Sequence, residues 1–220
     1  MPSTLRAVST VVLSCLLLAG CESAPLDSSS PSGSVSPPAA SSGAGGAGRA
    51  IAVGAGPQKK YTVQQQPAAG TCHYRYEKRE PLEDPACTPG AVSPAVTQAN
   101  LASTICRKGG YTSGVRPSTY VTAKEKKLNA ASYGFTGSMG DAEYDHLISL
   151  QLGGDPNDAR NLWVEPADPG HRKGSGVNNL KDPVETKLHT AVCSGKVTLA
   201  AAQQAIATDW TTALSTLGLS

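Results

Sequence analysis

The chain has 220 residues, a formal net charge of +2 and 39% hydrophobic residues. A charge so close to balance neither requires nor excludes a nucleic-acid partner. No apolar run approaches the roughly 20 residues that a membrane-spanning helix needs, which argues against an integral membrane protein.

The first 20 residues have the layout of an export signal. Arg6 gives a positive start, residues 7–18 are apolar, and small residues lead to Cys21. The ending Leu-Ala-Gly-Cys resembles the lipobox of bacterial lipoproteins. This implies that residues 1–20 are a lipoprotein signal peptide and that a lipid on Cys21 anchors the protein to the extracytoplasmic face of the cell membrane. The alternative is an ordinary secretory signal with an incidental cysteine.

Residues 21–70 are dominated by Ser, Pro, Gly and Ala. Such a segment buries too little apolar surface to offset the entropy of ordering it. We therefore predict a disordered tether that holds a globular domain away from the membrane.

Residues 71–220 have the length of one ordinary domain with a single core. The four cysteines in this part favour disulfides, because the export signal places the chain outside the reducing cytoplasm. Three connectivities exist, and the sequence alone does not choose between them. We favour Cys72–Cys87 as a local pair and Cys106–Cys193 as a long-range pair.

The sequence predicts two elements before the centre of the domain. Thr122 and Glu125 have the spacing of a capping box, and Gly134 suits the end of a helix, so we expect a helix over 123–133. Apolar and polar residues then alternate, which predicts a short strand over 144–150.

A loop over 153–160 and a second short strand over 161–165 are expected next. Asp182 followed by Pro183 has the pattern of a helix start, and this helix should run to Val192. Thr198 should cap a last helix with a core-facing stripe formed by Leu199, Ala202, Ile206, Trp210 and Leu214.

The most informative stretch is residues 143–163. It contains an Asp145-His146 pair at the end of an alternating run, a Gly-Gly turn, and Asn161-Leu-Trp at the start of the next apolar run. This pattern resembles the HNH, or ββα-metal, nuclease motif. Segments 86–92, 115–117 and 181–195, and the closing Asp-Trp region, are similar to a group of actinobacterial exported HNH-like proteins. The resemblance implies an α+β fold with a ββα-metal core, flanking helices and stabilising disulfides.

The resemblance also implies roles for three residues. His146 would be the general base, since an imidazole with a pKa near 6.5 can take a proton from water. Asp145 would hold the metal ion. Asn161 would tie the loop between the strands, or reach the metal as it does in some members.

The third metal-ligating position is open between two residues. Asn178 stands where the motif usually has a histidine, three residues before Lys181, and His171 is the other candidate. An Asn oxygen suits Mg²⁺ or Mn²⁺ better than Zn²⁺, so we expect one divalent ion, with Mg²⁺ or Mn²⁺ favoured. His189 is interpreted as a core or surface histidine, and His73 as inert.

The predicted function is metal-dependent hydrolysis of nucleic acid, more often DNA than RNA, by an HNH-type endonuclease. Phosphate contacts are expected from Arg160, Arg172, Lys173 and Lys181. No protein partner is evident. The alternative is a non-catalytic envelope lipoprotein on a degenerate HNH scaffold. An ion pair between Lys181 and Asp145, with no open cavity beside it, would favour this alternative.

Overall fold

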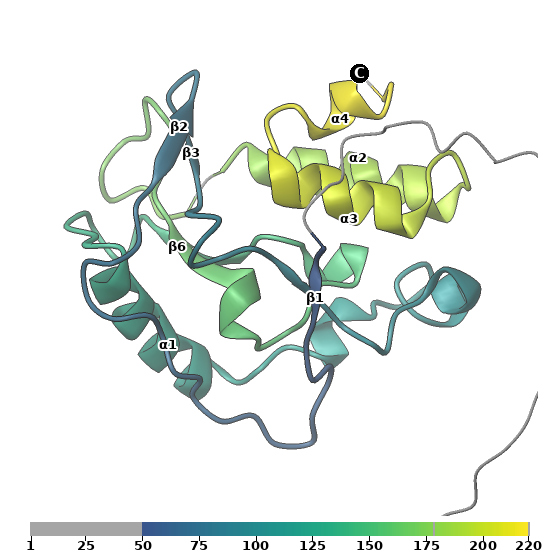
Figure 1. Ribbon diagram of the computed structural model, residues 1–220, viewed down its shortest axis with the longest axis horizontal. Coiled ribbons are helices and arrows are strands. Elements are labelled where there is room, and N and C mark those ends of the chain that lie inside the picture. Colours follow the sequence, from purple (N-terminus) through teal and green to yellow (C-terminus); the bar gives the residue numbers. More distant parts are fainter. Residues whose placement is uncertain (1–49, 178, 220) are drawn as a thin grey trace, which may run out of the picture. The chain divides into compact units, whose positions relative to one another are not determined.

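A computed structural model describes residues 50–177 and 179–219. The predicted signal peptide over residues 1–20, Cys21 and Asn178 lie outside the described residues. The described part belongs to one compact unit, residues 45–220. It is an α+β fold of helices and two-stranded sheets, stapled by two disulfides, with α2, α3 and α4 grouped together (Figure 1).

The folded unit begins earlier than predicted, because residues 51–70 contact the domain. Strand β1 (Ala52–Val53) pairs in parallel with β4 (Ala91–Val92). The following segment crosses to α1 (Thr119–Ser132), where the amide of Gln64 donates to the Glu125 carboxylate at 2.7 Å. The part of the predicted tether from residue 51 is therefore ordered by main-chain hydrogen bonds that its Ser/Pro/Gly/Ala composition does not reveal.

Helix α1 begins four residues earlier than expected. Its N-cap is Ser118, which has the extended backbone of a cap residue, with φ −66° and ψ 154°. Glu125 does not take part in a capping box; it is buried and binds Gln64. The predicted end is confirmed, since Gly134 follows the helix with a left-handed φ of 58°.

Two antiparallel strands form the centre of the domain. Strand β5 (Glu143–His146) pairs with β6 (Leu162–Glu165), with Asp145 opposite Trp163. The predicted strand over 144–150 is too long, because beyond Leu147 the backbone bonds to the Asn161 side chain instead of to β6. Helix α1 packs against β6.

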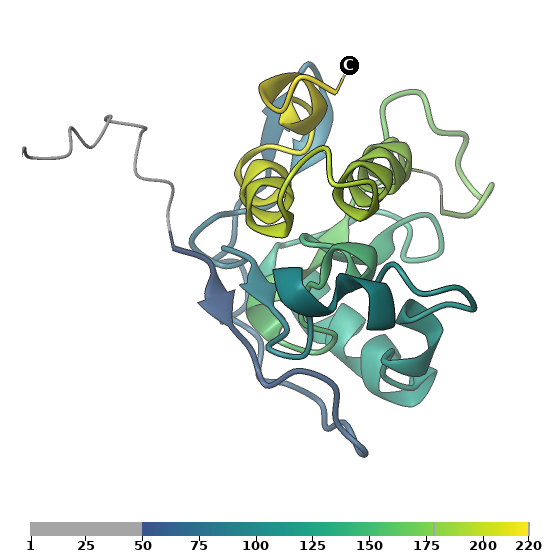
Figure 2. The same cartoon turned by 90° about the vertical axis from the view of Figure 1, so that its right-hand side faces the viewer.

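Two smaller pairs and three helices complete the fold. Strands β2 (Arg75–Glu77) and β3 (Glu80–Leu82) form a hairpin. Helices α2 (Lys181–Cys193), α3 (Leu199–Thr208) and α4 (Ala213–Thr216) pack on one another (Figure 2).

The two predicted C-terminal helices are confirmed, but their ends differ from the prediction. Helix α2 begins at Lys181, before the predicted cap Asp182, and its N-cap Leu180 makes no side-chain capping bond. The Thr198 side chain caps α3 as expected, accepting from the Ala201 amide. The helix ends at Thr208, because Asp209 bonds forward to Thr211. Trp210 nevertheless enters the core, 3% exposed, and its indole donates to the Pro81 carbonyl.

The favoured disulfide pairing is confirmed as Cys72–Cys87 and Cys106–Cys193. Disulfides of this kind indicate a location outside the reducing cytoplasm. Among the residues that the structure describes, no helix has the length and apolar character needed to cross a bilayer.

We predict that Glu125→Gln stabilises the protein at high pH. Burial raises the pKa of Glu125 from 4.5 to about 7, against the hydrogen bonds from Gln64 and Asn157 that favour the charged form. The raised value means that its contribution to stability is complete below pH 4.5 and is lost as the pH rises through about 7. The variant should gain about 1 kcal/mol or more in free energy of unfolding at pH 8.

Urea unfolding of both proteins at pH 4 and pH 8 measures this difference. The gain should vanish at pH 4, because the wild-type carboxyl is then neutral. An equal loss of stability at both pH values would contradict the prediction.

Candidate functional site

Asp145 and His146 end strand β5 and, being neighbours on a strand, point to opposite faces of the sheet. The carboxylate of Asp145 faces the start of α2. Its Oδ2 accepts from Lys181 Nζ at 2.7 Å and from the indole of Trp163 at 3.4 Å. The Asp145 side chain is therefore held by a cation and a neutral donor.

Lys181 is the buried cation of this site, with only 1% of the residue exposed. Its ammonium donates to Asp145, to the His146 carbonyl at 2.9 Å and to Glu185, so all three of its protons are used. Burial would lower the pKa of Lys181, but the surrounding carboxylates outweigh burial and raise it. Lys181 thus carries a full positive charge inside the protein.

Lys181 does not balance all of the negative charge around it. Glu143 and Glu165 are cross-strand partners on the face that carries Asp145, and Glu185 comes from α2. We call Glu143, Asp145, Glu165 and Glu185 the carboxylate cluster. Four acidic groups thus surround one ammonium.

The pKa values of the individual carboxyl groups are shifted in this cluster. Burial raises the pKa of Glu143 and of Glu185 to about 7. Burial raises the pKa of Glu165 well above its ordinary value, and neither of its carboxylate oxygens has a hydrogen-bond partner. A buried carboxylate without a partner is costly unless it takes up a proton or gains a cation.

His146 lies on the other face, 7% exposed. Its Nε2 is 3.1 Å from the Pro156 carbonyl oxygen. A carbonyl only accepts, so this bond assigns the proton to Nε2 and the lone pair to Nδ1. Burial lowers the pKa of His146 to about 4, against the opposing effect of Asp145. The ring is therefore neutral at pH 7, with a free lone pair on Nδ1, and its lowered pKa makes it a weaker base than an exposed imidazole.

Asn161 ties the loop after β5 to the start of β6. Its Nδ2 donates to the carbonyls of Ile148 and Asp155 at 3.0 Å each, and its Oδ1 accepts from the Ile148 amide at 3.0 Å. Since the carboxamide is engaged in backbone bonds, it has no role as a metal ligand in this conformation.

The hydrogen bonds of Asn161 require a glycine at position 154 of the Gly-Gly turn. A Cβ on Gly154 would lie 1.7 Å from the Ile148 carbonyl oxygen and 2.8 Å from Asn161 Nδ2. Only glycine fits so close to the backbone. The glycine, the carboxamide and the two strands therefore position Asp145 and His146 together.

The structure does not bring His171 to Asp145. His171 lies 3.3 Å from Asp141, on the wall of a separate pocket of about 460 Å³. Hydrogen bonds from Gly174 and Gly176, and the nearby His171, lower the pKa of Asp141 to about 2. His171 is thus the partner of a second carboxylate, and it is not placed to complete the Asp145 site.

The four predicted phosphate contacts have different surroundings. Arg172 and Lys173 are exposed in the loop between β6 and α2. Arg160 is exposed and paired with Asp158 at 2.6 Å. Lys181 is buried and its protons are used inside the protein, so the expectation that it touches phosphate does not fit this structure.

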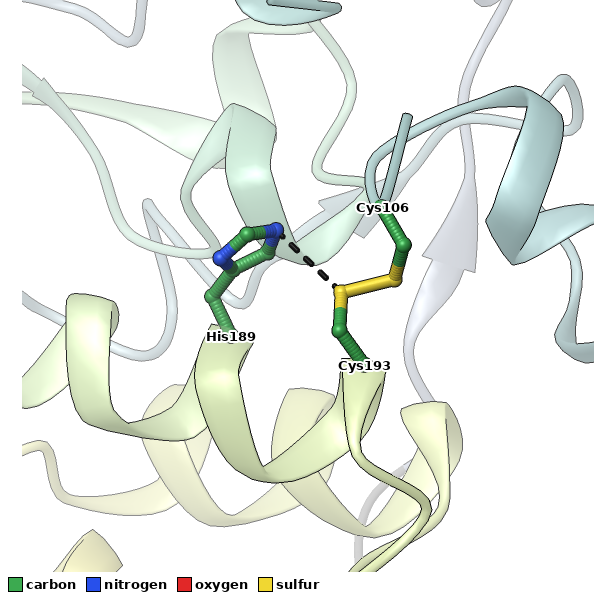
Figure 3. A group of neighbouring side chains, drawn as sticks. All are labelled: Cys106, His189 and Cys193. Carbon is green, nitrogen blue, oxygen red and sulfur yellow. Dashed lines mark hydrogen bonds between the residues drawn. A yellow bond between two sulfur atoms is a disulfide. The ribbon is translucent and has the colours of Figure 1, made fainter. Parts of the chain in front are cut away.

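His189 lies beside the long-range disulfide (Figure 3). Its Nε2 is 2.9 Å from the Ile105 carbonyl and 3.3 Å from Cys193 Sγ. His189, Cys106 and Cys193 could hold a metal ion, because their ligand atoms lie within 4.8 Å of one another. The two sulfurs are bonded to each other here, and a thiolate is needed to bind a metal, so this group requires reduction first.

Sequence reasoning missed most of the carboxylate cluster. Glu143 lies two positions before Asp145, which is the spacing of residues on one face of a strand. This signal was available in the sequence. Glu165 and Glu185 join the cluster only through the strand register and the packing of α2, which the sequence does not display.

Comparisons with protein-family models, with curated proteins and with solved structures give no match for this chain.

We predict that Lys181→Met destabilises the protein by about 3 to 5 kcal/mol, because it leaves buried carboxylates without their cation. The double variant Lys181→Met/Asp145→Asn should recover part of this loss, since it also removes one of the charges. Urea denaturation of both variants measures the difference. A Lys181→Met protein as stable as the wild type would show that the ion pair contributes nothing.

Proposed function

We propose that this protein is an exported, metal-dependent nuclease that hydrolyses phosphodiester bonds at an HNH-like site. One observation carries the proposal. Asp145 of the carboxylate cluster and a neutral, fixed His146 ring are neighbours at the end of β5, on opposite faces of the strand pair, and helix α2, which follows β6, closes over the cluster. This is the order of elements and groups that the resemblance to a ββα-metal site implies.

The residues of the cluster fit a hard divalent ion. Carboxylate oxygens are the donors that Mg²⁺ and Mn²⁺ prefer. Glu165 contributes two buried oxygens that have no hydrogen-bond partner. We propose that Asp145 and Glu165, with Glu143, would hold the ion. A bound ion would supply positive charge to the phosphate and lower the pKa of water.

The chain's own residues have separate tasks in this account. His146 accepts a proton from water at Nδ1, while the Pro156 carbonyl fixes the ring through Nε2. Asn161 keeps the loop that carries Pro156 in place. Lys181 orients Asp145 and offsets part of the cluster's charge.

The principal test is cleavage of supercoiled plasmid and single-stranded RNA by the full chain, with disulfides intact. Mg²⁺, Mn²⁺ and Zn²⁺ are each compared with EDTA. Because loss of a general base costs about 10²- to 10⁴-fold, His146→Ala should lose that much activity. His73→Ala, an exposed histidine on the β2 side, should retain full activity and is the matched control.

Metal binding gives a second test that does not depend on cleavage. Glu165→Gln should weaken Mn²⁺ binding, measured calorimetrically, by about tenfold or more, the effect of losing about 1.4 kcal/mol. The exposed Glu77→Gln is the control and should bind as the wild type does. Equal affinity in both variants would remove Glu165 from the proposed ligands.

A second candidate function is a non-catalytic envelope module on the same scaffold. The Lys181–Asp145 ion pair favours it, because an ammonium already occupies the carboxylate that the nuclease would use for its metal. A folded protein that cleaves neither substrate with any of the three metals would support this function over the nuclease.

A further inference from the structure

A basic groove lies between the N-terminal segment and the start of α1. Its volume is about 690 Å³. Four of the residues that line it are cationic and none is acidic, although the whole chain is nearly neutral. The cations are Lys59, Lys60, Arg116 and Lys124, all with exposed side chains.

The two walls of the groove are held in place by hydrogen bonds to each other. The hydroxyl of Tyr61 donates to the Val115 carbonyl at 2.6 Å. Three residues later, Gln64 is bonded to Glu125 of α1. The one carboxylate of α1 is thus turned inward and bonded to Gln64.

The start of α1 adds positive potential to the same groove. Ser118 lines the groove and is the N-cap of this 14-residue helix, and its side chain makes no capping hydrogen bond. The amide groups at a helix start carry partial positive charge and bind phosphate well. The helix start and the four cations therefore favour the same kind of ligand.

An aromatic side chain is available beside these charges. Tyr120 is 69% exposed. Lys124 Nζ lies 4.0 Å from the centre of its ring and 2.6 Å from its hydroxyl. An exposed ring among cations is the combination that binds single-stranded nucleic acid, because unpaired bases stack on the ring while the backbone meets the charges.

One wall of the groove is bonded to the loop that holds His146. The Thr62 carbonyl accepts from Asn157 at 2.9 Å, and Asn157 follows Pro156, the partner of His146. On the other wall, the charge of Arg116 is among the causes that lower the pKa of His146. The groove is therefore connected to the loop of the proposed general base.

From these contacts we infer that the basic groove binds single-stranded nucleic acid. The inference rests on the proposed function for its role in cleavage, while binding itself can be tested alone. It also assigns phosphate contacts to residues other than the four expected from the sequence, namely Lys59, Lys60, Arg116 and Lys124.

The test is fluorescence anisotropy of a labelled single-stranded oligonucleotide with the full chain in EDTA, which prevents metal-dependent cleavage. Lys60→Glu/Arg116→Glu should weaken binding by about tenfold or more and reduce the salt dependence by about one phosphate contact or more. Tyr120→Ala should weaken it by about fivefold or more. Lys187→Glu/Lys196→Glu, an equal charge change at exposed residues near the end of α2, should bind as the wild type does.

Three outcomes would overturn the inference. These are equal weakening in the control variant, unchanged binding in the groove variants, and binding of a duplex or of polyphosphate as tight as that of the single strand. His146→Ala should bind normally. If the groove variants weaken oligonucleotide binding but no metal ion supports cleavage, the proposed nuclease activity is contradicted and the inference about the groove stands.

Discussion

The site depends on how the protein accommodates four carboxylates around one buried lysine. The ammonium of Lys181 holds Asp145 and Glu185 and bonds the end of β5 to α2. Burying this pair alone would contribute little to stability, since desolvation offsets the attraction. Glu165 remains without a partner. A requirement for acidic groups at this site therefore explains the carboxylate cluster better than a contribution to stability does.

The surrounding structure positions this cluster and His146 through backbone contacts. Asn161 and Gly154 allow the chain to turn tightly between β5 and β6. The N-terminal segment then packs over α1 and reaches the loop that holds His146. A segment whose composition is typical of a tether thus becomes one wall of a basic groove.

Local sequence patterns predicted much of this fold. Helix α2 and the cap at Thr198 follow from local helix signals, and the number of cysteines predicted two disulfides. The sequence itself did not choose among the three possible pairings. The predicted start of α1 was wrong. Ser118 and Thr122 are both residue types that cap helices well, and the hydrogen bond between Glu125 and Gln64 removes Glu125 from a capping box with Thr122.

The site was predicted only in part for a related reason. The Asp145-His146 pair and Asn161 are close in sequence, and their spacing is set by a strand, a turn and a strand. Glu165 reaches the cluster through the register of β5 and β6, and Lys181 reaches it through the packing of α2. Both depend on the whole fold. A sequence pattern therefore identified the motif but not the charges that surround it.

The most direct measurement of the central claim is anomalous diffraction from crystals of the full chain grown with Mn²⁺. The account predicts an anomalous peak within bonding distance of Asp145 and Glu165. A well-ordered carboxylate cluster at saturating Mn²⁺, with no peak beside it and Lys181 still on Asp145, would contradict a metal site and with it the proposed nuclease.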